Sequence, residues 1–395
     1  MKTNHIKAEI EKLSNLIFDD VVSYRKWIHK HPELSFQEEK TSEYICSILK
    51  KNNIKFLNNI AGHGITVTIE GKKPKSRIIG FRADMDALPI NEENEVDYKS
   101  VNQGVMHACG HDVHSSILLG VAIIVNRLKE NLFGTIKFIF QPAEEKLPGG
   151  ASLMIKAGVL KNPNIEKMIA LHVFPEMEVG NVGFRSGQYM AACDELSIEI
   201  IGKGGHAALT NEVTNPITIA SELILRTKEK VLKKKTSSPY VLEYGDFRAL
   251  GASNVIPEKA LIQGTLRTMD EIFRKEVHEV LIGEVLEIEK KYKAKCIFNI
   301  TKGYPSLFND PFVTEDCIKL SHDILDKSNI HNLPIRMASE DFSFFSQECP
   351  SSFFRLGVAN SSKGITHLVH TSKFNIDHSA IRIGLNLMSY FAFKI

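Results

Sequence analysis

The stretch MHACGHDVHSSILLGVAIIVNRLKENLFGTIKFIFQPAEE, residues 106–145, decides the fold class. Apolar residues at positions 113, 117, 121, 124 and 128 repeat at the spacing of one helical face. They predict a helix over 113–130, with Asp112 placed to cap it. The run IKFIF at 136–140, which is mostly β-branched and aromatic, predicts a strand. This alternation of helix and strand is typical of an α/β protein.

The same alternation continues outward from this stretch. The N-terminal 20 residues have scattered charges and predict an amphipathic helix, not a targeting segment. We predict further strands at 65–70, 78–82, 168–173 and 353–357, and further helices at 37–51, 311–327 and 378–393. Short strands separated by helices predict a largely parallel central sheet.

Between about residue 190 and residue 303 the pattern changes. We predict strand 194–202, helix 213–235, strands 240–250 and 260–268, helix 270–292 and strand 295–301. This β-α-β-β-α-β order is a ferredoxin-like unit, which is a compact domain by itself. We therefore expect a catalytic α/β domain of residues 1–188 and 304–395, interrupted by an inserted domain of residues 189–303.

Composition excludes several classes of function. The chain has 49 basic and 47 acidic residues, and a net charge of +2 gives no reason to expect nucleic acid or an anionic membrane as partner. No apolar run reaches the 18 residues expected of a membrane span. The six cysteines have no framework spacing, so we expect free thiols and a cytoplasmic protein.

Cys109 and His111 are the first candidate metal ligands. They are two residues apart, so their side chains share a face of an extended segment, and they stand just before a predicted helix. Thiolate and imidazole are both good ligands for zinc and similar ions. The alternative interpretation is a buried cysteine beside a helix-capping histidine. A thiol hydrolase built on Cys109 is a further alternative.

Other donor residues also stand at the ends of predicted strands. Glu144 and Glu145 follow strand 136–140, so one carboxylate could bind a cation while the other acts as general base. His172 ends strand 168–173. The loops at the carboxyl ends of parallel strands meet at one edge of a sheet. The alternatives are a solvated acidic loop and a core histidine.

The remaining candidates are less specific. His370 would be a further donor, with His367 as an alternative. Asp86 is interpreted as an acceptor that orients a ligand histidine, whereas Asp84 could be ligand or orienting group; a turn ended by Pro89 would explain both. Ser339, Glu340 and Asp341 could line the site, but they also suit the start of a helix, which we favour.

Several segments occur together in one order. They are HPELSFQE (31–38), RADMDALP (82–89), MHACGHDVH (106–114), QPAEE (141–145), ALHVFP (170–175), GKGGHAA (202–208), NVIP (254–257), GTLRT (264–268) and MASEDFSFF (337–345). Together they resemble the M20D branch of the M20 metallopeptidase family, which includes N-acyl-amino-acid amidohydrolases such as hippurate hydrolase and the plant auxin-conjugate hydrolases. The resemblance runs from about residue 20 to the C-terminus.

The resemblance implies roles for individual residues. The implied metal ligands are Cys109, His111, Glu145, His172 and His370. Glu144 matches the general base, and His206 matches a residue that stabilises the developing oxyanion, typically from a partner subunit. Asn254 and Arg267 match positions that hold the substrate's carboxylate. Two divalent metal ions per subunit are implied, with Zn²⁺, Mn²⁺, Co²⁺ and Ni²⁺ as candidates, and a homodimer formed through the inserted lid domain.

The implied activity is cleavage of the amide bond of N-acyl-L-amino acids by a metal-activated water. A metal-dependent dipeptidase or carboxypeptidase of the same fold and an N-acetyl-diaminopimelate deacetylase are the alternatives. Two departures from the family pattern concern loop geometry and substrate preference. Leu209 and Thr210 stand where a proline is usual after GKGGHAA, and His378 stands where an acidic residue is common.

Overall fold

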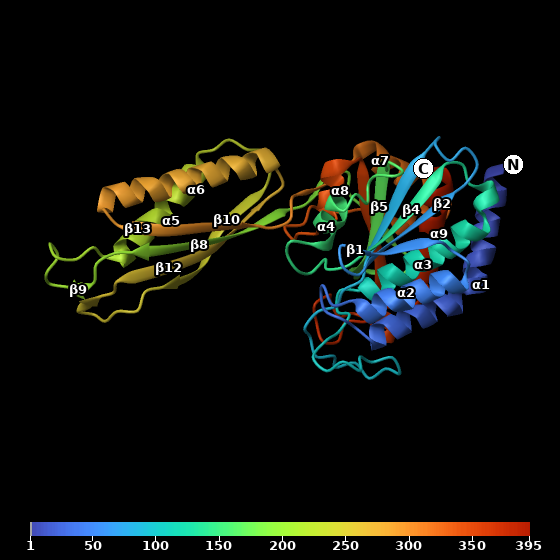
Figure 1. Cartoon of the computed structure of the whole chain (residues 1–395), viewed down its shortest axis with the longest axis horizontal. Coiled ribbons are helices and arrows are strands. Elements are labelled where there is room, and N and C mark those ends of the chain that lie inside the picture. The colour runs from blue at the N-terminus through green and yellow to red at the C-terminus, as the bar shows by residue number, and fades with distance from the viewer. Residues whose placement is uncertain (1) are drawn as a thin grey trace. The chain divides into compact units, whose positions relative to one another are not determined.

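The computed structural model describes residues 2–395, which form two compact units (Figure 1). Unit 1 comprises the chain up to Gln188 together with Phe308–Ile335 and Asp341–Ile395. Unit 2 comprises Tyr189–Leu307 and the short segment Arg336–Glu340. The chain passes from one unit to the other within β7 (Gly187–Met190), within β14 (Leu307–Asn309) and at both ends of the segment Arg336–Glu340.

Unit 1 is built on an eight-stranded sheet with the order β1-β2-β4-β3-β5-β16-β6-β15. The strands are β1 (Phe56–Ile60), β2 (Gly64–Glu70), β3 (Ile78–Asp84), β4 (Thr135–Gln141), β5 (Lys167–Glu178), β6 (Val182–Phe184), β15 (Ile330–Asn332) and β16 (Ser351–Ala359). The central strands β4, β3, β5 and β16 are parallel, whereas β1, β2 and β6 add antiparallel pairs. The predicted α/β class is confirmed.

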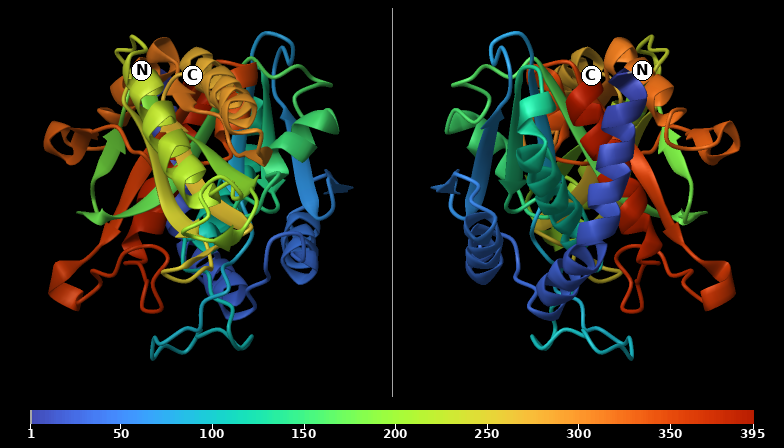
Figure 2. Two further views of the ribbon diagram at one scale, coloured as in Figure 1. Left: turned by 90° about the vertical axis from the view of Figure 1, so that its left-hand side faces the viewer. Right: turned by 90° about the vertical axis from the view of Figure 1, so that its right-hand side faces the viewer.

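The helices of unit 1 pack on this sheet. They are α1 (Lys2–Lys30), α2 (Glu39–Lys51), α3 (His111–Arg127), α4 (Gly150–Lys156), α7 (Pro311–Ser321), α8 (Ser343–Glu348) and α9 (Ser379–Lys394), with 3-10 turns η1 (Lys129–Asn131), η2 (Lys327–Asn329) and η3 (Ser361–Lys363). Helix α3 contacts β3 and β4 and also contacts α1 and α9, which lie beside it in Figure 2.

Helix α3 contains most of the apolar run that begins at Val113. All of its residues except the last two, Asn126 and Arg127, are buried. At Gly120 an added Cβ would lie 2.5 Å from Leu385 and 2.9 Å from Val21, so glycine allows α1 and α9 to approach closely. The predicted cap is wrong. The helix begins at His111 after Gly110, and the side chain of Asp112 forms no cap hydrogen bond because it bonds Arg25 and His29 inside the protein.

The predicted helix over 311–327 is longer than the observed one. Helix α7 ends at Ser321, and the chain then turns through hydrogen bonds such as that from the Asp323 N–H to the Leu320 carbonyl. Ile324 and Leu325 pack against the core from this turn. Their apolar character therefore reflects burial and not helical periodicity.

Unit 2 is a four-stranded antiparallel sheet with the order β10-β12-β8-β13. Its elements are β8 (Ala192–Ile201), β9 (Gly205–His206), α5 (Pro216–Leu232), β10 (Tyr240–Arg248), β11 (Val255–Ile256), β12 (Lys259–Thr268), α6 (Glu271–Tyr292) and β13 (Lys295–Lys302). Helices α5 and α6 contact each other and cover one face of the sheet (Figure 1). This is the predicted ferredoxin-like order.

Helix α5 starts three residues later than predicted, because Asn215 caps it by accepting from the Ile217 N–H and Pro216 occupies its first turn. All six cysteines are unpaired in the described residues, as predicted. Within residues 2–395, none of the helices is both long enough and apolar enough to cross a membrane.

Candidate metal centre

The donor residues come together at the carboxyl edge of the parallel strands in unit 1. Cys109 and His111 bracket the start of α3, Glu145 follows β4, and His172 lies within β5. His370 reaches the same place from the loop between η3 and α9. Cys109 forms one close group with His111 and His172 and another with Glu145 and His370, and within each group the ligand atoms lie within 4.8 Å of one another.

Gly110 makes the turn between Cys109 and His111. Its φ is +84°, a backbone conformation that residues with a Cβ rarely adopt. An added Cβ would also lie 2.4 Å from the side chain of Val173, next to His172 in β5. The CGH sequence therefore brings the first two donors against the strand that carries the third.

The thiol of Cys109 is central to this cluster. Its Sγ lies 3.5 Å from Nε2 of His172 and 3.3 Å from Nε2 of His370. Nε2 of His370 is also 3.2 Å from Oε1 of Glu145. Hydrogen bonds to Cys109 and Glu145 raise the pKa of His370 to about 10. The sulfur, imidazole and carboxylate atoms of these residues therefore lie close to one point, and this arrangement favours a cation there.

His172 has the protonation state that a ligand needs. Its Nδ1 lies 2.8 Å from the carbonyl oxygen of Val173, so the neutral ring carries its proton on Nδ1 and donates it there. Burial lowers the pKa of His172 well below its usual value, which keeps the ring neutral. The lone pair of Nε2 therefore faces the thiol of Cys109.

His111 supplies the clearest evidence that the cluster fits a metal. The residue is fully buried, and its Nε2 has no hydrogen-bond partner in residues 2–395. That nitrogen lies 3.9 Å from Oε1 of Glu145 and 4.0 Å from Oε2 of Glu144. An orphaned buried nitrogen is costly unless something binds it. A divalent cation would satisfy it together with the carboxylate and the thiolate.

Asp86 contacts two of these donors. Its Oδ1 lies 3.1 Å from Nδ1 of His111, and its Oδ2 accepts hydrogen bonds from the Glu145 N–H and the Ser35 hydroxyl. Burial alone would raise the pKa of Asp86, but the hydrogen bond from His111 holds it below the usual value. A carboxylate that fixes a ligand histidine in this way also sets its tautomer.

Asp84 forms a close donor group with His111 and His114, and its Oδ2 lies 3.8 Å from Nε2 of His111. Its Oδ2 pairs with the Arg82 guanidinium at 2.6 Å, and its Oδ1 lies 2.6 Å from Nδ1 of His114. Nε2 of His114 in turn accepts a hydrogen bond from the Val173 N–H. Both oxygens of Asp84 therefore have partners within the protein. His367 joins no donor group in the described chain, whereas His370 lies in one with Cys109 and Glu145.

Glu144 lies next to the donors and forms close groups with His111 and Glu145 and with Glu340 and Asp341. It is 6% exposed, and its Oε1 lies 3.4 Å from the backbone nitrogen of Asp341. The Asp341 carboxylate accepts hydrogen bonds from Arg82, Gln141 and the Ala151 N–H. The helix-start interpretation of Asp341 is therefore wrong, because α8 begins at Ser343 without a side-chain cap. Asp341 instead fixes the backbone that contacts Glu144.

The predicted residues of unit 2 form a separate arrangement. His206 and Asn254 are adjacent because β9 pairs with β11, where Val255 lies opposite His206. Nδ1 of His206 accepts a hydrogen bond from the Ala208 N–H, so the neutral ring carries its proton on Nε2. Arg267 lies on β12, and its guanidinium donates to the Met337 carbonyl at 3.4 Å.

Residues 80–394 match the model of the family described as peptidase family M20/M25/M40. The chain belongs to the M20 family. It is therefore a metal-dependent hydrolase of the amidohydrolase and peptidase type.

Two curated M20 relatives and one solved structure illustrate the range of the family. The N-acyl-L-amino acid amidohydrolase of Geobacillus stearothermophilus is 39% identical over 304 residues, which cover 77% of this chain and 81% of the relative. Thermostable carboxypeptidase 2 of Saccharolobus solfataricus is 34% identical over 392 residues and covers 98% of each chain. The Bacillus subtilis protein YXEP, described as a dinuclear metal-binding M20 peptidase, has a TM-score of 0.81 at 28% identity, with 96% of this chain and 98% of that one covered.

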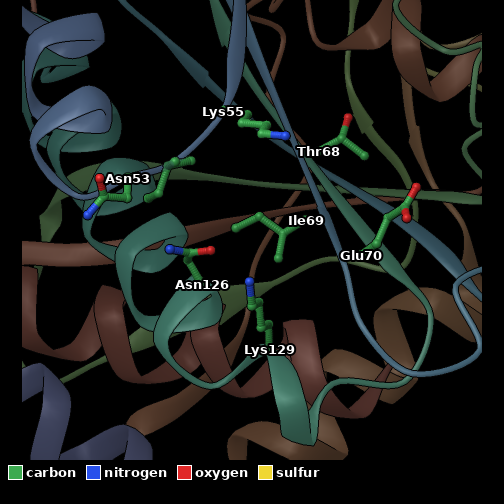
Figure 3. Close-up of a pocket in the computed structure, with 8 residues that line it drawn as sticks. Asn53, Lys55, Thr68, Ile69, Glu70, Asn126 and Lys129 are labelled. Carbon is green, nitrogen blue, oxygen red and sulfur yellow. The ribbon is translucent and has the colours of Figure 1, made fainter.

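A hollow of about 240 Å³ lies away from the candidate metal centre (Figure 3). It is lined by Asn53, Ile54, Lys55, Thr68, Ile69, Glu70, Asn126 and Lys129. Ile69 and Glu70 pair with the first residues of β4, whereas the donor Glu145 follows the last residue of that strand. This hollow therefore lies at the opposite edge of the sheet from the metal donors.

Proposed function

We propose that this M20 hydrolase cleaves the amide bond of N-acyl-L-amino acids. The observation that carries the proposal is the convergence of thiol, imidazole and carboxylate donors with Glu144 beside them. The amidohydrolase relative, at 39% identity, supports the choice of substrate.

A pair of divalent ions would be held by residues that the cluster brings together: Cys109, His111, Glu145, His172 and His370. When bound, such ions lower the pKa of a water molecule and polarise the amide carbonyl. The thiol favours a soft ion such as Zn²⁺, with Mn²⁺, Co²⁺ and Ni²⁺ as the other candidates.

Glu144 would act as the general base and then as the general acid. Its carboxylate would take a proton from the attacking water and deliver it to the departing nitrogen, which leaves poorly as an amide anion. The contact with the Asp341 N–H holds one oxygen of Glu144 in place. The other oxygen, Oε2, is the one that lies toward His111.

The proposed roles in unit 2 follow from the chemistry of its residues. His206 presents an Nε2–H donor, which suits it to stabilise the oxyanion that develops on the carbonyl. Arg267 would bind the substrate's carboxylate with its fork of donors, and Asn254 would add a further hydrogen bond. By the family resemblance, unit 2 would serve as lid and dimer interface, so that His206 acts on the partner's substrate.

A second hollow, also of about 240 Å³, supports an apolar acyl group as the other half of the substrate. It borders Glu145, and its walls combine the apolar residues Leu34, Ala87, Leu88 and Pro89 with the polar residues Ser35, Gln37 and Lys146. Such apolar walls gain free energy by covering apolar surface of the acyl group. The benzoyl group of a hippurate-like substrate has this character.

A dipeptidase or carboxypeptidase activity is the second candidate. It is favoured by the carboxypeptidase relative, which covers 98% of this chain. An N-acetyl-diaminopimelate deacetylase is a special case of the first class, in which the acyl group is small and the amino acid is polar.

A substrate panel tests the proposal. Protein freed of metal with a chelator and reloaded with each ion would be assayed on acetyl-, benzoyl-, succinyl- and indoleacyl-amino acids and on unblocked dipeptides. We expect metal-dependent turnover of at least one N-acyl amino acid, with kcat/KM well above that for dipeptides. Preference for dipeptides would support the second candidate. Activity that survives chelation but is lost with Cys109→Ser would indicate a thiol hydrolase instead.

A further inference from the structure

We propose that Glu38 is a positioning residue that holds the turn carrying Glu144 and Glu145. Glu38 ends the segment HPELSFQE, which the proposed function has not used. The inference rests on that function only in taking Glu144 as the base. The contacts themselves belong to unit 1 alone.

One oxygen of Glu38 holds two unusual backbone positions at once. Oε1 accepts a hydrogen bond from the Phe36 N–H at 3.0 Å and another from the Ala143 N–H at 2.7 Å. Phe36 has a φ of +68° and Ala143 has a φ of +52°. Residues with a Cβ rarely adopt this left-handed conformation, and it persists only where neighbours enforce it.

Ala143 directly precedes Glu144, so its conformation sets the direction of the base. Its N–H is held by Glu38, and its carbonyl accepts a hydrogen bond from the Gly150 N–H at 2.8 Å. An added Cβ at Gly150 would lie 1.7 Å from the Pro142 carbonyl oxygen, so this side of the turn is fixed by close backbone packing. Glu38 supplies the opposite side from 105 residues away in the chain.

The position of Glu38 is unfavourable for a residue that only stabilises the fold. The side chain is fully buried, and its Oε2 has no hydrogen-bond partner among residues 2–395. Burial and the nearby Asp86 carboxylate raise the pKa of Glu38 to about 7. An apolar side chain would avoid this desolvation cost. An apolar side chain could not, however, accept the hydrogen bond that the Ala143 N–H donates.

A second contact from the same segment acts on the backbone of Glu145 through the Asp86 carboxylate. The Ser35 hydroxyl donates to Oδ2 of Asp86 at 2.7 Å, and that oxygen also accepts the Glu145 N–H at 2.9 Å. Residues 35–38 thus hold the turn at Ala143 directly and at Glu145 through Asp86. The segment controls where both carboxylates point.

Three variants at Glu38 test the role, with the exposed neighbour Glu39→Gln as the matched control. Glu38→Gln keeps a carbonyl oxygen for both N–H groups, so kcat should stay within about threefold of wild type. Glu38→Ala should lower kcat about a hundredfold with little change in KM, because a small misplacement of a reacting group has an effect of this size. Glu38→Asp keeps the charge but is one methylene shorter, so it should resemble Glu38→Ala, and it serves if the alanine variant does not fold.

The strain at Ala143 gives a more specific test. Glycine adopts positive φ without the Cβ penalty, so Ala143→Gly should restore part of the kcat lost in Glu38→Ala. A residue that acts only on global stability would not be rescued in this way. A double variant as inactive as Glu38→Ala, with both proteins folded, would overturn the proposal. So would a Glu38→Ala variant with wild-type kcat.

Hydrogen exchange separates this inference from the proposed function. In metal-free protein, amides of residues 141–150 should exchange faster in Glu38→Ala and Glu38→Asp than in wild type or Glu39→Gln, whatever substrate the enzyme takes. Unchanged exchange in this peptide would contradict the role of Glu38 even if the amidohydrolase activity is confirmed. Faster exchange in a protein that hydrolyses no N-acyl amino acid would leave the role of Glu38 intact and remove the proposed function.

Discussion

The candidate metal centre of unit 1 and the candidate substrate-binding residues of unit 2 differ in how far folding has prepared them. His111 and His172 are buried, and each has a hydrogen bond that fixes its ring. His206 and Asn254 are exposed, and short β9 and β11 hold them. Most of the metal donors are therefore pre-organised within one unit, whereas the side chains of the second set remain accessible to solvent. Substitutions in unit 1 should therefore weaken metal binding or impair the general base. Substitutions in unit 2 should change kcat or KM and leave metal binding unchanged.

The largest effect is expected at the base. Glu144→Gln removes the group that accepts and returns the proton, so kcat should fall by about ten-thousandfold. Metal content, measured by elemental analysis of the purified protein, should stay at the wild-type level because the ligand set is intact. A Glu144→Gln enzyme with substantial turnover would show that another group is the base.

His206 should give the next largest effect. His206→Ala removes an oxyanion donor, so kcat should fall about a hundredfold to a thousandfold, again with unchanged metal content. Mixing this variant with Glu144→Gln tests the role of the partner subunit. If His206 acts across a dimer, refolded mixtures should regain activity, because a hybrid dimer contains one intact site. Exchanged hybrids without activity would place His206 in its own subunit's site.

A substitution at Arg267 tests whether unit 2 binds the carboxylate of the substrate. Arg267→Gln should raise KM for N-acyl amino acids by up to about a hundredfold, since a hydrogen-bonded ion pair to the carboxylate is lost. The matched control is an N-acyl amine of the same acyl group, which has no carboxylate and should be hydrolysed equally by both enzymes. An equal loss on both substrates would mean that Arg267 supports the fold and not the carboxylate.

Asp86 should affect metal binding where the residues of unit 2 do not. Asp86→Asn replaces an acceptor of the Glu145 N–H and the Ser35 hydroxyl, and it weakens the orientation of His111. Affinity for Zn²⁺, measured by competition with a chromophoric chelator, should fall about ten- to a hundredfold. Wild-type affinity would show that Asp86 does not orient the ligand.

The smallest effect is expected at His367. It is exposed and near His370 in sequence, so His367→Ala should change kcat/KM by no more than about twofold. His370→Ala, the matched comparison, should weaken metal binding. A reversal of these two results would exchange the roles of the two histidines.

Sequence reasoning worked best where a residue's role follows from its place at the end of an element. Cys109 stands just before α3 and Glu145 follows β4. His172 was expected to end its strand, but it lies inside β5, which continues to Glu178. The carboxyl edge of a parallel sheet nevertheless brings such positions together. The helix and strand periods were strong enough to predict both sheets. The short strands β1, β6 and β15 of unit 1 were not predicted, because segments of three to five residues carry too little periodicity to reveal a strand.

Sequence reasoning failed where a polar side chain finds its partner far away in the chain. Asp112 was expected to cap α3 but pairs with Arg25, 87 residues away. Asp341 was expected to start a helix but bonds Arg82, 259 residues away. Such pairs have no period and no local signal, since the same residue types serve as caps. The contact between Glu38 and Ala143 belongs to this group.

The central claim is that donors from distant parts of unit 1 bind a pair of divalent ions. The absorbance of metal-free protein titrated with Co²⁺ tests it most directly, because a thiolate ligand gives a charge-transfer band in the near ultraviolet. We predict saturation at two ions per chain, with a band that disappears in Cys109→Ser. A titration that shows no thiolate band, or no tight binding, would contradict the claim.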